Sequence, residues 1–158
     1  MKVTKVEVIR SKEPIQLPEP WLASWNSPDG TPITSMGFSF YKVHTDEGIV
    51  GIGPDTGFYN PSILIGFDPF MVGDFWSKYM SGRRAGHSGY GASGLEIALW
   101  DIMGKATNQP IYKLLGGGKD KIFVYAATSR LLTIDQHIKQ VQDAMDEEIG
   151  RASCRERV

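Results

Sequence analysis

Alternating apolar and polar positions predict three strands in the first third of the chain. Residues 3–10 carry valines on one face and a glutamate on the other, which is typical of a half-buried strand. Residues 37–44 and 49–53 alternate in the same way, on either side of the turn residues 45–48. Because the turn ends in glycine, which adopts positive φ without strain, the arrangement favours a hairpin. The pattern therefore predicts a small antiparallel meander of three strands.

Two segments with helical periodicity follow the meander. Residues 68–80 place aromatic and aliphatic side chains three and four positions apart, with Asp68 as the cap and Pro69 as the first helical residue. The second segment carries a continuous apolar stripe and is ended by Asn108 and Pro110. The members of this stripe are Leu95, Ala98, Leu99, Ile102, Met103 and Ala106.

Between the first strand and the hairpin, proline and glycine are too dense for a helix or a central strand. Prolines stand at positions 14, 18, 20, 28 and 32, and Asp29 is followed by Gly30. We therefore expect residues 11–35 to form one long loop.

The pattern changes character after the glycines at 116–118. Residues 122–127 form an apolar run without alternation, which is typical of a strand covered on both faces, as in a parallel sheet. Thr133 and Gln136 then form a capping box at the start of an amphipathic helix. A meander with helices, followed by the start of a βα unit, predicts an α+β fold with a first domain at 1–117 and a second beginning at 118–147.

The last eleven residues, 148–158, match the translation of a common sequencing adapter along their whole length. The stretch ends the preceding helical period and has no turn or strand pattern of its own. We expect it to be a non-native tail, with a natural charged tail as the alternative.

Composition narrows the class of protein. Hydrophobic residues make up 41% of the 158 and charged residues 22%, the profile of a globular chain. The net charge of −1, with both signs scattered, argues against a nucleic-acid partner. No run of apolar residues is long enough for a membrane span or a signal peptide, so we expect a cytoplasmic protein without a membrane partner. Cys154 is the single cysteine, which excludes an internal disulfide.

The segment 93–117, SGLEIALWDIMGKATNQPIYKLLGG, closely resembles the first signature of the mandelate racemase/muconate lactonizing enzyme family of the enolase superfamily. Weaker matches are FYKVHTDEGIVGIG in the hairpin, LIGFDPF before the first helix and KDKIFVYA at the apolar run. The chain departs from the family at Gly91, where members prefer alanine, and before Leu64, where members usually carry another helix. Either this lineage lacks that helix or the sequence has suffered a deletion.

The resemblance implies an enolase-type N-terminal capping domain followed by the first β/α unit of a truncated TIM-like barrel. It implies an Mg²⁺-dependent lyase or isomerase, with an acid-sugar dehydratase as one candidate, that removes the proton next to the carboxylate of a small substrate. Mg²⁺ held by three carboxylates would stabilise the enolate. The family's catalytic and metal-binding residues lie on later barrel strands, so we expect none in this chain. The parent enzyme would be a homo-oligomer.

The resemblance also implies that two loops act as a lid that selects the substrate and excludes water. They correspond to residues 14–35 and 54–60. Candidates for apolar contact with the substrate are Trp21, Trp25 and Tyr59, and candidates for polar contact are Asn26 and Asp55. Two alternatives stay open: the aromatic residues pack against their own loops, and the chain by itself is an inactive folding or association module or a truncated gene product.

Three other patterns favour structural roles. Residues 89–94 satisfy G-x-G-x-x-G, but no strand precedes them and no acidic residue follows at the required distance, so we do not expect a dinucleotide site. His44 and His137 lie on a predicted strand and helix, where a paired structural histidine is expected. Glu96 and Asp101 are five residues apart on a helix and face different directions, which favours capping and ion pairing over catalysis.

Overall fold

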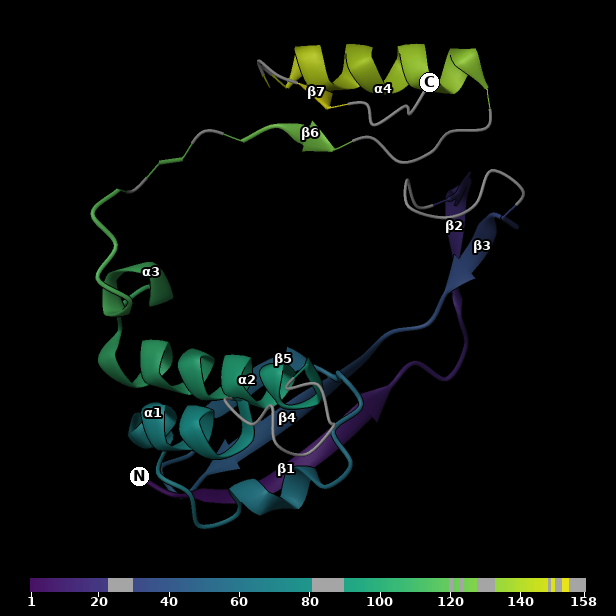
Figure 1. Cartoon of the computed structure of the whole chain (residues 1–158). Coiled ribbons are helices and arrows are strands. Elements are labelled where there is room, and N and C mark those ends of the chain that lie inside the picture. The colour runs from purple at the N-terminus through teal and green to yellow at the C-terminus, as the bar shows by residue number, and fades with distance from the viewer. Residues whose placement is uncertain are drawn as a thin grey trace. The chain divides into compact units, whose positions relative to one another are not determined.

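A computed structural model of the chain describes residues 1–22, 30–80, 90–119, 121–122, 124–127, 133–147, 149 and 152–153. The chain divides into two compact units (Figure 1). Unit 1 comprises residues 1–12 and 38–118, and unit 2 comprises residues 13–37 and 119–158. Residues 13–37, part of the first domain predicted from the sequence, thus group with the C-terminal residues in this structure.

Unit 1 contains the predicted antiparallel meander. Its strands are β1 (Val3–Arg10), β4 (Ser39–Thr45) and β5 (Val50–Pro54), in the order β1-β4-β5. The register pairs Val8 with Tyr41 and Tyr41 with Gly53, so these three residues share one face of the sheet. The three-stranded meander is confirmed.

The predicted first helix is present as a helical segment of mixed geometry. It consists of a 3-10 turn η2 (Pro69–Met71), a short α1 (Val72–Phe75) and a π-helical turn η3 (Trp76–Met80). The Asp68 carboxylate accepts a hydrogen bond from the Phe70 N–H at 3.0 Å, so the predicted cap is confirmed. A further 3-10 turn, η1 (Pro61–Leu64), lies in the shortened stretch before Leu64.

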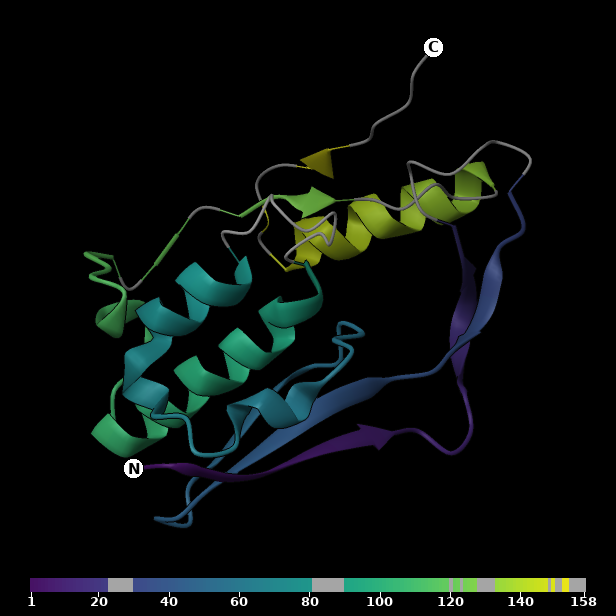
Figure 2. The ribbon, with the colours of Figure 1, turned by 60° about the horizontal axis from the view of Figure 1, so that its bottom comes forward.

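The predicted second helix is α2 (Tyr90–Thr107), and a single turn α3 (Ile111–Leu114) follows it. Asn108 ends α2 with a φ of +52°, a conformation that asparagine tolerates better than most residues. Figure 2 shows the helices of unit 1, in teal and green, on one face of the sheet. The predicted stop at Asn108 is confirmed.

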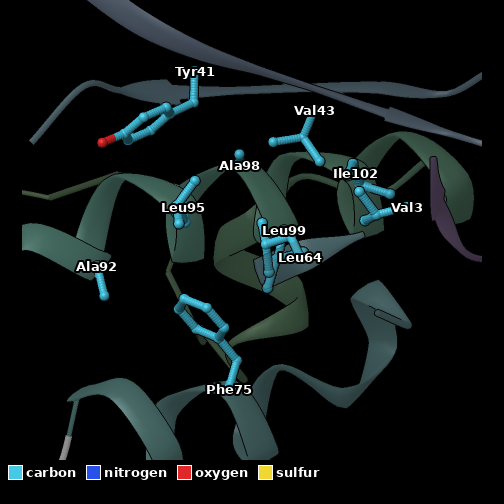
Figure 3. Packing of buried hydrophobic residues seen from close by; sticks show 10 residues of the cluster. All are labelled: Val3, Tyr41, Val43, Leu64, Phe75, Ala92, Leu95, Ala98, Leu99 and Ile102. Carbon is cyan, nitrogen blue, oxygen red and sulfur yellow. The ribbon is translucent and has the colours of Figure 1, made fainter. Parts of the chain in front are cut away.

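The core of unit 1 has α2 at its centre. Tyr41 and Val43 point from the sheet toward Ala98 of α2, and Phe75 of α1 approaches the opposite side of the helix (Figure 3). Because both sides of α2 are covered, Leu95, Ala98, Leu99 and Ile102 have no exposed surface. The apolar stripe predicted from the sequence is therefore buried from Leu95 to Met103, whereas its last predicted member, Ala106, is exposed.

Glycines allow α2 to pack directly on the backbone of β5. A Cβ atom at Gly53 would lie 2.0 Å from the Gly94 carbonyl oxygen, and one at Gly94 would lie 1.8 Å from the Pro54 carbonyl oxygen. A Cβ at Gly51 would lie 2.2 Å from the Ala98 carbonyl oxygen. Real Cβ contacts are never this short, so the spacing between helix and strand depends on these glycines.

Unit 2 corrects the prediction of one long loop at 11–35. Residues within it form an antiparallel pair, β2 (Ile15–Trp21) and β3 (Ile33–Met36). The pairing is regular at Ile15 and Gln16 but shifts before Trp21, where Pro18 and Pro20 interrupt it. Proline cannot donate to a ladder but is tolerated in an isolated edge pair, which the proline count alone does not reveal.

The remaining elements of unit 2 are α4 (Ile134–Asp146) and a two-residue parallel pair of β6 (Ala126–Ala127) and β7 (Ala152–Ser153). The capping box of Thr133 and Gln136 is confirmed. A strand in the C-terminal tail was not predicted, because the tail has no alternating pattern.

The apolar run at 122–127 is largely uncovered in this chain. Of the described residues in this run, only Ala126 and Ala127 are in strand pairing, and Ile122 and Val124 are 78% and 60% exposed. The pattern predicts cover on both faces in a complete parallel sheet, and the described residues of this chain do not supply that cover. Such a run needs neighbouring strands on both sides, and the described residues supply only the short β7. Within the described part of the chain, no helix combines the length and apolar character that crossing a membrane requires.

Candidate functional site

The loop that follows β5, residues 55–59, is the best-defined candidate surface in unit 1. The hydroxyl oxygen of Tyr41, which lies at the inner face of β4, accepts a hydrogen bond from the Phe58 N–H at 2.9 Å. The Asp55 carboxylate accepts one from the Gly57 N–H at 3.0 Å, and Gly57 itself has a φ of +77°. The first bond holds the loop to the sheet, and the second fixes the turn within the loop.

Asp55 is predicted as a polar substrate contact, and its side chain lies within the loop's own network. It is 8% exposed, and its Oδ2 lies 3.4 Å from Nη2 of Arg10. The pKa of Asp55 is lowered, first by the hydrogen bond that the Tyr41 hydroxyl donates and next by the Gly57 N–H. Burial and the neighbouring Asp55 raise the pKa of Tyr41, which keeps its hydroxyl protonated.

Thr56 ties the same loop to the beginning of α2. Its hydroxyl donates to the Gly91 carbonyl at 2.8 Å, and its oxygen accepts from the Gly94 N–H at 3.2 Å. Gly91 and Gly94 lie in the first turns of α2, so the hydroxyl binds two backbone groups at the N-terminal end of the helix. The loop is thereby fixed to the helix as well as to the sheet.

Tyr59 is the aromatic residue that this loop presents to solvent. Its side chain is 79% exposed, and its ring centroid lies 4.8 Å from that of Phe58. Phe58 in turn packs edge-on against Tyr79 at 6.2 Å. The alternative that the aromatics pack against their own loop thus describes Phe58, whereas Tyr59 leaves most of its surface open to a ligand.

The other predicted contact residues lie on the segment of unit 2 that includes β2 and β3. Trp21, at the end of β2, is 37% exposed and borders a cavity of about 420 Å³ between this strand pair and α4. Trp25 and Asn26 lie outside the described residues. The cavity is lined by Leu17, Pro18, Glu19, Pro20, Trp21, Met36, Lys139 and Gln140. Its lining combines apolar side chains with the charged residues Glu19 and Lys139.

The residues that the structure describes do not fit a magnesium site. Among them, no three histidine, cysteine, aspartate or glutamate side chains come close enough to hold a metal ion. Asp55, the carboxylate nearest the exposed Tyr59 in sequence, already accepts from Tyr41 and Gly57. A hard cation such as Mg²⁺ needs several oxygen ligands at once.

The signature helix α2 also protects the free edge of β5. Asp101 Oδ2 accepts a hydrogen bond from the Ile52 N–H at 2.8 Å, and Lys105 Nζ donates to the Val50 carbonyl at 2.7 Å. The two side chains are themselves paired at 2.6 Å. The ion pairing expected for Asp101 is confirmed, and its second role, hydrogen bonding to the edge strand, was not predicted.

The expected structural role of His44 is also confirmed. Its Nε2 lies 2.6 Å from Oε1 of Glu7 across the β1–β4 pair. The pKa of Glu7 is lowered, first by a hydrogen bond from Lys5 and next by one from His44. This cluster lies on the face of the sheet opposite to Tyr41.

The sequence did not single out Tyr41 and Arg10. A signal was present for Tyr41, because an inward-facing tyrosine on a strand brings a hydroxyl into the core, where it needs a partner. Arg10 ends β1, and nothing in its local pattern indicates a partner 45 residues away.

Comparison with known proteins gives one family. The model of the mandelate racemase/muconate lactonizing enzyme N-terminal domain matches residues 6–116. A D-galactonate dehydratase family member of Streptomyces bingchenggensis is 35% identical over 133 residues, which cover 73% of this chain and 31% of that protein. The D-galactonate dehydratase of Pectobacterium atrosepticum is 36% identical over a segment that covers 80% of this chain and 31% of that protein. The cis-3-hydroxy-L-proline dehydratase of Roseibium aggregatum is 31% identical over a segment that covers 82% of this chain and 38% of that protein.

Solved structures show the same fold. An enolase superfamily member from Polaromonas sp. JS666 is 27% identical with a TM-score of 0.68, covering 92% of this chain and 42% of that one. The L-talarate/galactarate dehydratase of Salmonella typhimurium LT2, liganded with Mg and L-lyxarohydroxamate, has a TM-score of 0.70 at 21% identity, covering 96% and 43%. The chain spans about a third of the length of the curated relatives it matches.

Proposed function

Since the chain belongs to the mandelate racemase/muconate lactonizing enzyme family through its N-terminal domain, we propose that it is the substrate-selecting part of a longer Mg²⁺-dependent lyase or isomerase. Residues 1–117 are the capping domain and residues 118–147 the start of the barrel. The complete enzyme abstracts the proton next to the carboxylate of a small acid. The ligands of its Mg²⁺ and its catalytic bases belong to other parts of the complete protein.

The exposed Tyr59 is the single observation that carries the lid role. Four consecutive residues before it, 55–58, are fixed by hydrogen bonds to the sheet and to α2 or by ring packing, yet Tyr59 is 79% exposed. An aromatic side chain on a rigid loop is a low-entropy contact surface, because few rotatable bonds need to be ordered on binding. Trp21, on the other predicted lid segment, is a separate candidate for contact with substrate.

Dehydration of an acid sugar is the reaction we favour for the complete protein. The relatives named above are a D-galactonate dehydratase, a member of the D-galactonate dehydratase family and a cis-3-hydroxy-L-proline dehydratase. For the cofactor we propose Mg²⁺, which the family resemblance implies and which the Salmonella dehydratase of the same fold binds. It would stabilise negative charge on the substrate carboxylate when the proton is removed.

The test is to recover the reading frame that continues beyond residue 147, express the complete protein and assay it with D-galactonate and related aldonic acids in the presence of Mg²⁺. We expect formation of a 2-keto acid that is abolished by EDTA. The Tyr59→Ala variant should raise KM about tenfold or more with a smaller change in kcat, because the loop acts in binding. A complete protein that turns over no carboxylate substrate contradicts the proposal.

A second candidate function applies to the chain by itself, which we infer to be catalytically inactive and to act only by folding or association. The observation in its favour is that the described residues do not fit a metal site. The test is to incubate the chain with Mg²⁺ and 2-hydroxy acids in D₂O. Exchange of the α-proton above a metal-free control would overturn this inference.

A further inference from the structure

The hydroxyl of Tyr41 has no role in filling the core. The Tyr41 side chain is fully buried on the inner face of β4, among the side chains of α2. A phenylalanine ring would occupy the same volume without bringing a polar atom into the core. A buried hydroxyl costs free energy unless it is hydrogen-bonded, so its partners indicate what it is for.

The hydrogen-bonding partners of the Tyr41 hydroxyl lie in the loop 55–59. Tyr41 Oη accepts the Phe58 N–H at 2.9 Å and donates to the Asp55 carboxylate, and Thr56 is a further hydrogen-bonding neighbour. Asp55 is in turn bound by the Gly57 N–H and, more weakly at 3.4 Å, by Arg10, whose side chain is 72% exposed. The buried Tyr41 hydroxyl thus holds the loop from the core, alongside the hydrogen bonds of Thr56 to α2.

We propose that Tyr41 and Asp55 form a latch that fixes loop 55–59 and keeps Tyr59 exposed, with Tyr41 acting as a positioning residue. The latch is defined by the Tyr41 hydroxyl, the Asp55 carboxylate and the Phe58 N–H. What the exposed Tyr59 is used for rests on the proposed function above. The latch itself is a property of this chain and is testable without a substrate.

The direct test is amide hydrogen exchange of the 158-residue chain, measured residue by residue by NMR. Tyr41→Phe keeps the ring and removes the hydroxyl, and Tyr112→Phe is the matched control on the exposed turn α3. We expect the Phe58 amide to exchange about tenfold faster or more in Tyr41→Phe, while the Val43 and Leu99 amides keep their protection. A Phe58 amide within twofold of the wild type overturns the latch.

A second variant covers the case in which Tyr41→Phe loosens the whole unit. Asp55→Asn leaves the core ring intact and removes the charge that the latch depends on. We expect it to speed exchange at Gly57 and Phe58 in the same way. Faster exchange at Val43 and Leu99 as well, in both variants, would assign these residues to general stability and overturn the proposal.

A spectroscopic readout separates positioning from structure. With 3-fluorotyrosine incorporated, the ¹⁹F resonance of Tyr59, identified by its loss in Tyr59→Phe, reports on the loop. Among the described residues, the charged or titratable groups facing Asp55 are Arg10 from β1 and Tyr41 from β4. Within the acid range, below about pH 7, where the fluorophenol of Tyr59 stays protonated, we therefore expect its resonance to move only below about pH 4 and to stop moving in Asp55→Asn. A resonance that titrates equally in both proteins overturns the proposal.

In the complete protein the same variant separates the latch from the lid. Tyr41→Phe should raise KM about fivefold or more with kcat changed less than twofold, because it disorders a contact loop without touching the reacting atoms. Faster Phe58 exchange with an unchanged KM would leave the latch standing and contradict the use of Tyr59 in substrate binding.

Discussion

Single side chains, or their absence, decide how closely the signature helix approaches the sheet. At Gly53 and Gly94 the two backbones meet with no room for a methyl group, because a Cβ would lie 2.0 Å or less from a carbonyl oxygen. Neither position has a positive φ, so these glycines are required by space and not by backbone conformation. Gly51 and Gly53 of β5 therefore pack directly against Gly94 and Ala98 of α2.

Gly94→Ala should therefore destabilise the chain by about 1–3 kcal/mol, because the helix must move away from β5 to admit the methyl group. Gly73→Ala is the matched control, since Gly73 lies in α1 with nothing within 4 Å of its added Cβ. It should be neutral or stabilise by up to about 1 kcal/mol through helix propensity. Urea unfolding monitored by circular dichroism measures both. Equal effects of the two substitutions would contradict direct helix-to-strand packing.

Asp55 makes the stability of the unit depend on acid pH. Its pKa is lower in the folded state than in the unfolded state, so its contribution is full above the unfolded pKa and is lost as pH falls through the folded pKa. Asp55→Asn should lower the Tm at pH 7 and reduce the further loss of Tm between about pH 5 and pH 2. Thermal melts of wild type, Asp55→Asn and the exposed control Glu13→Gln test this. An unchanged acid profile in Asp55→Asn would contradict the lowered pKa.

At the scale of elements, α2 completes the sheet that it covers. β5 is an edge strand, and its outward N–H at Ile52 and outward carbonyl at Val50 are bound by Asp101 and Lys105 instead of by another strand. An edge with unsatisfied backbone groups invites pairing with a second chain. Asp101 and Lys105 of the signature therefore bind the edge strand in addition to forming an i,i+4 ion pair.

Asp101→Ala should cost about 2 kcal/mol, because the Ile52 N–H loses its partner and Lys105 loses its counter-ion. Asp74→Ala is the matched control, since Asp74 and Lys78 form an i,i+4 pair of the same order at 2.7 Å in the same unit. Its cost should stay within about 0.5 kcal/mol. Chemical denaturation gives both values, and sedimentation velocity shows whether the Asp101 variant self-associates. Equal losses of stability in the two variants would show that the hydrogen bond from Ile52 of the edge strand to Asp101 does not stabilise the chain.

At the scale of the whole molecule, the sequence predicts those parts whose cause is local or periodic. The stripe of α2, the Asp68 cap and the Thr133–Gln136 capping box each depend on residues a few positions apart. The strand pair around Pro18 and the latch of Tyr41 depend on contacts between distant segments. A composition rule therefore missed the strand pair, and Asp55 could be recognised as a loop residue but not as a partner of β4.

The exposed run at 122–127 depends on the whole molecule, because its cover must come from other strands. Ile122, Val124 and Tyr125 are 78%, 60% and 61% exposed, and an apolar extended segment with unpaired backbone is prone to self-association. Replacing Ile122 and Val124 together with lysine should therefore increase the monomer fraction of the chain without lowering its Tm. Sedimentation velocity across a concentration series measures the monomer fraction.

Ile134→Lys is the control for that experiment. Ile134 is 77% exposed, as Ile122 is, but it lies at the start of α4, where its backbone is part of a helix. If association follows from unpaired apolar strand, the helix substitution should leave the monomer fraction close to that of the wild type. If association follows from exposed apolar area alone, each replaced isoleucine should raise the monomer fraction to a similar degree. A wild-type chain that is monomeric at all concentrations would contradict both readings and imply that the run is covered in solution.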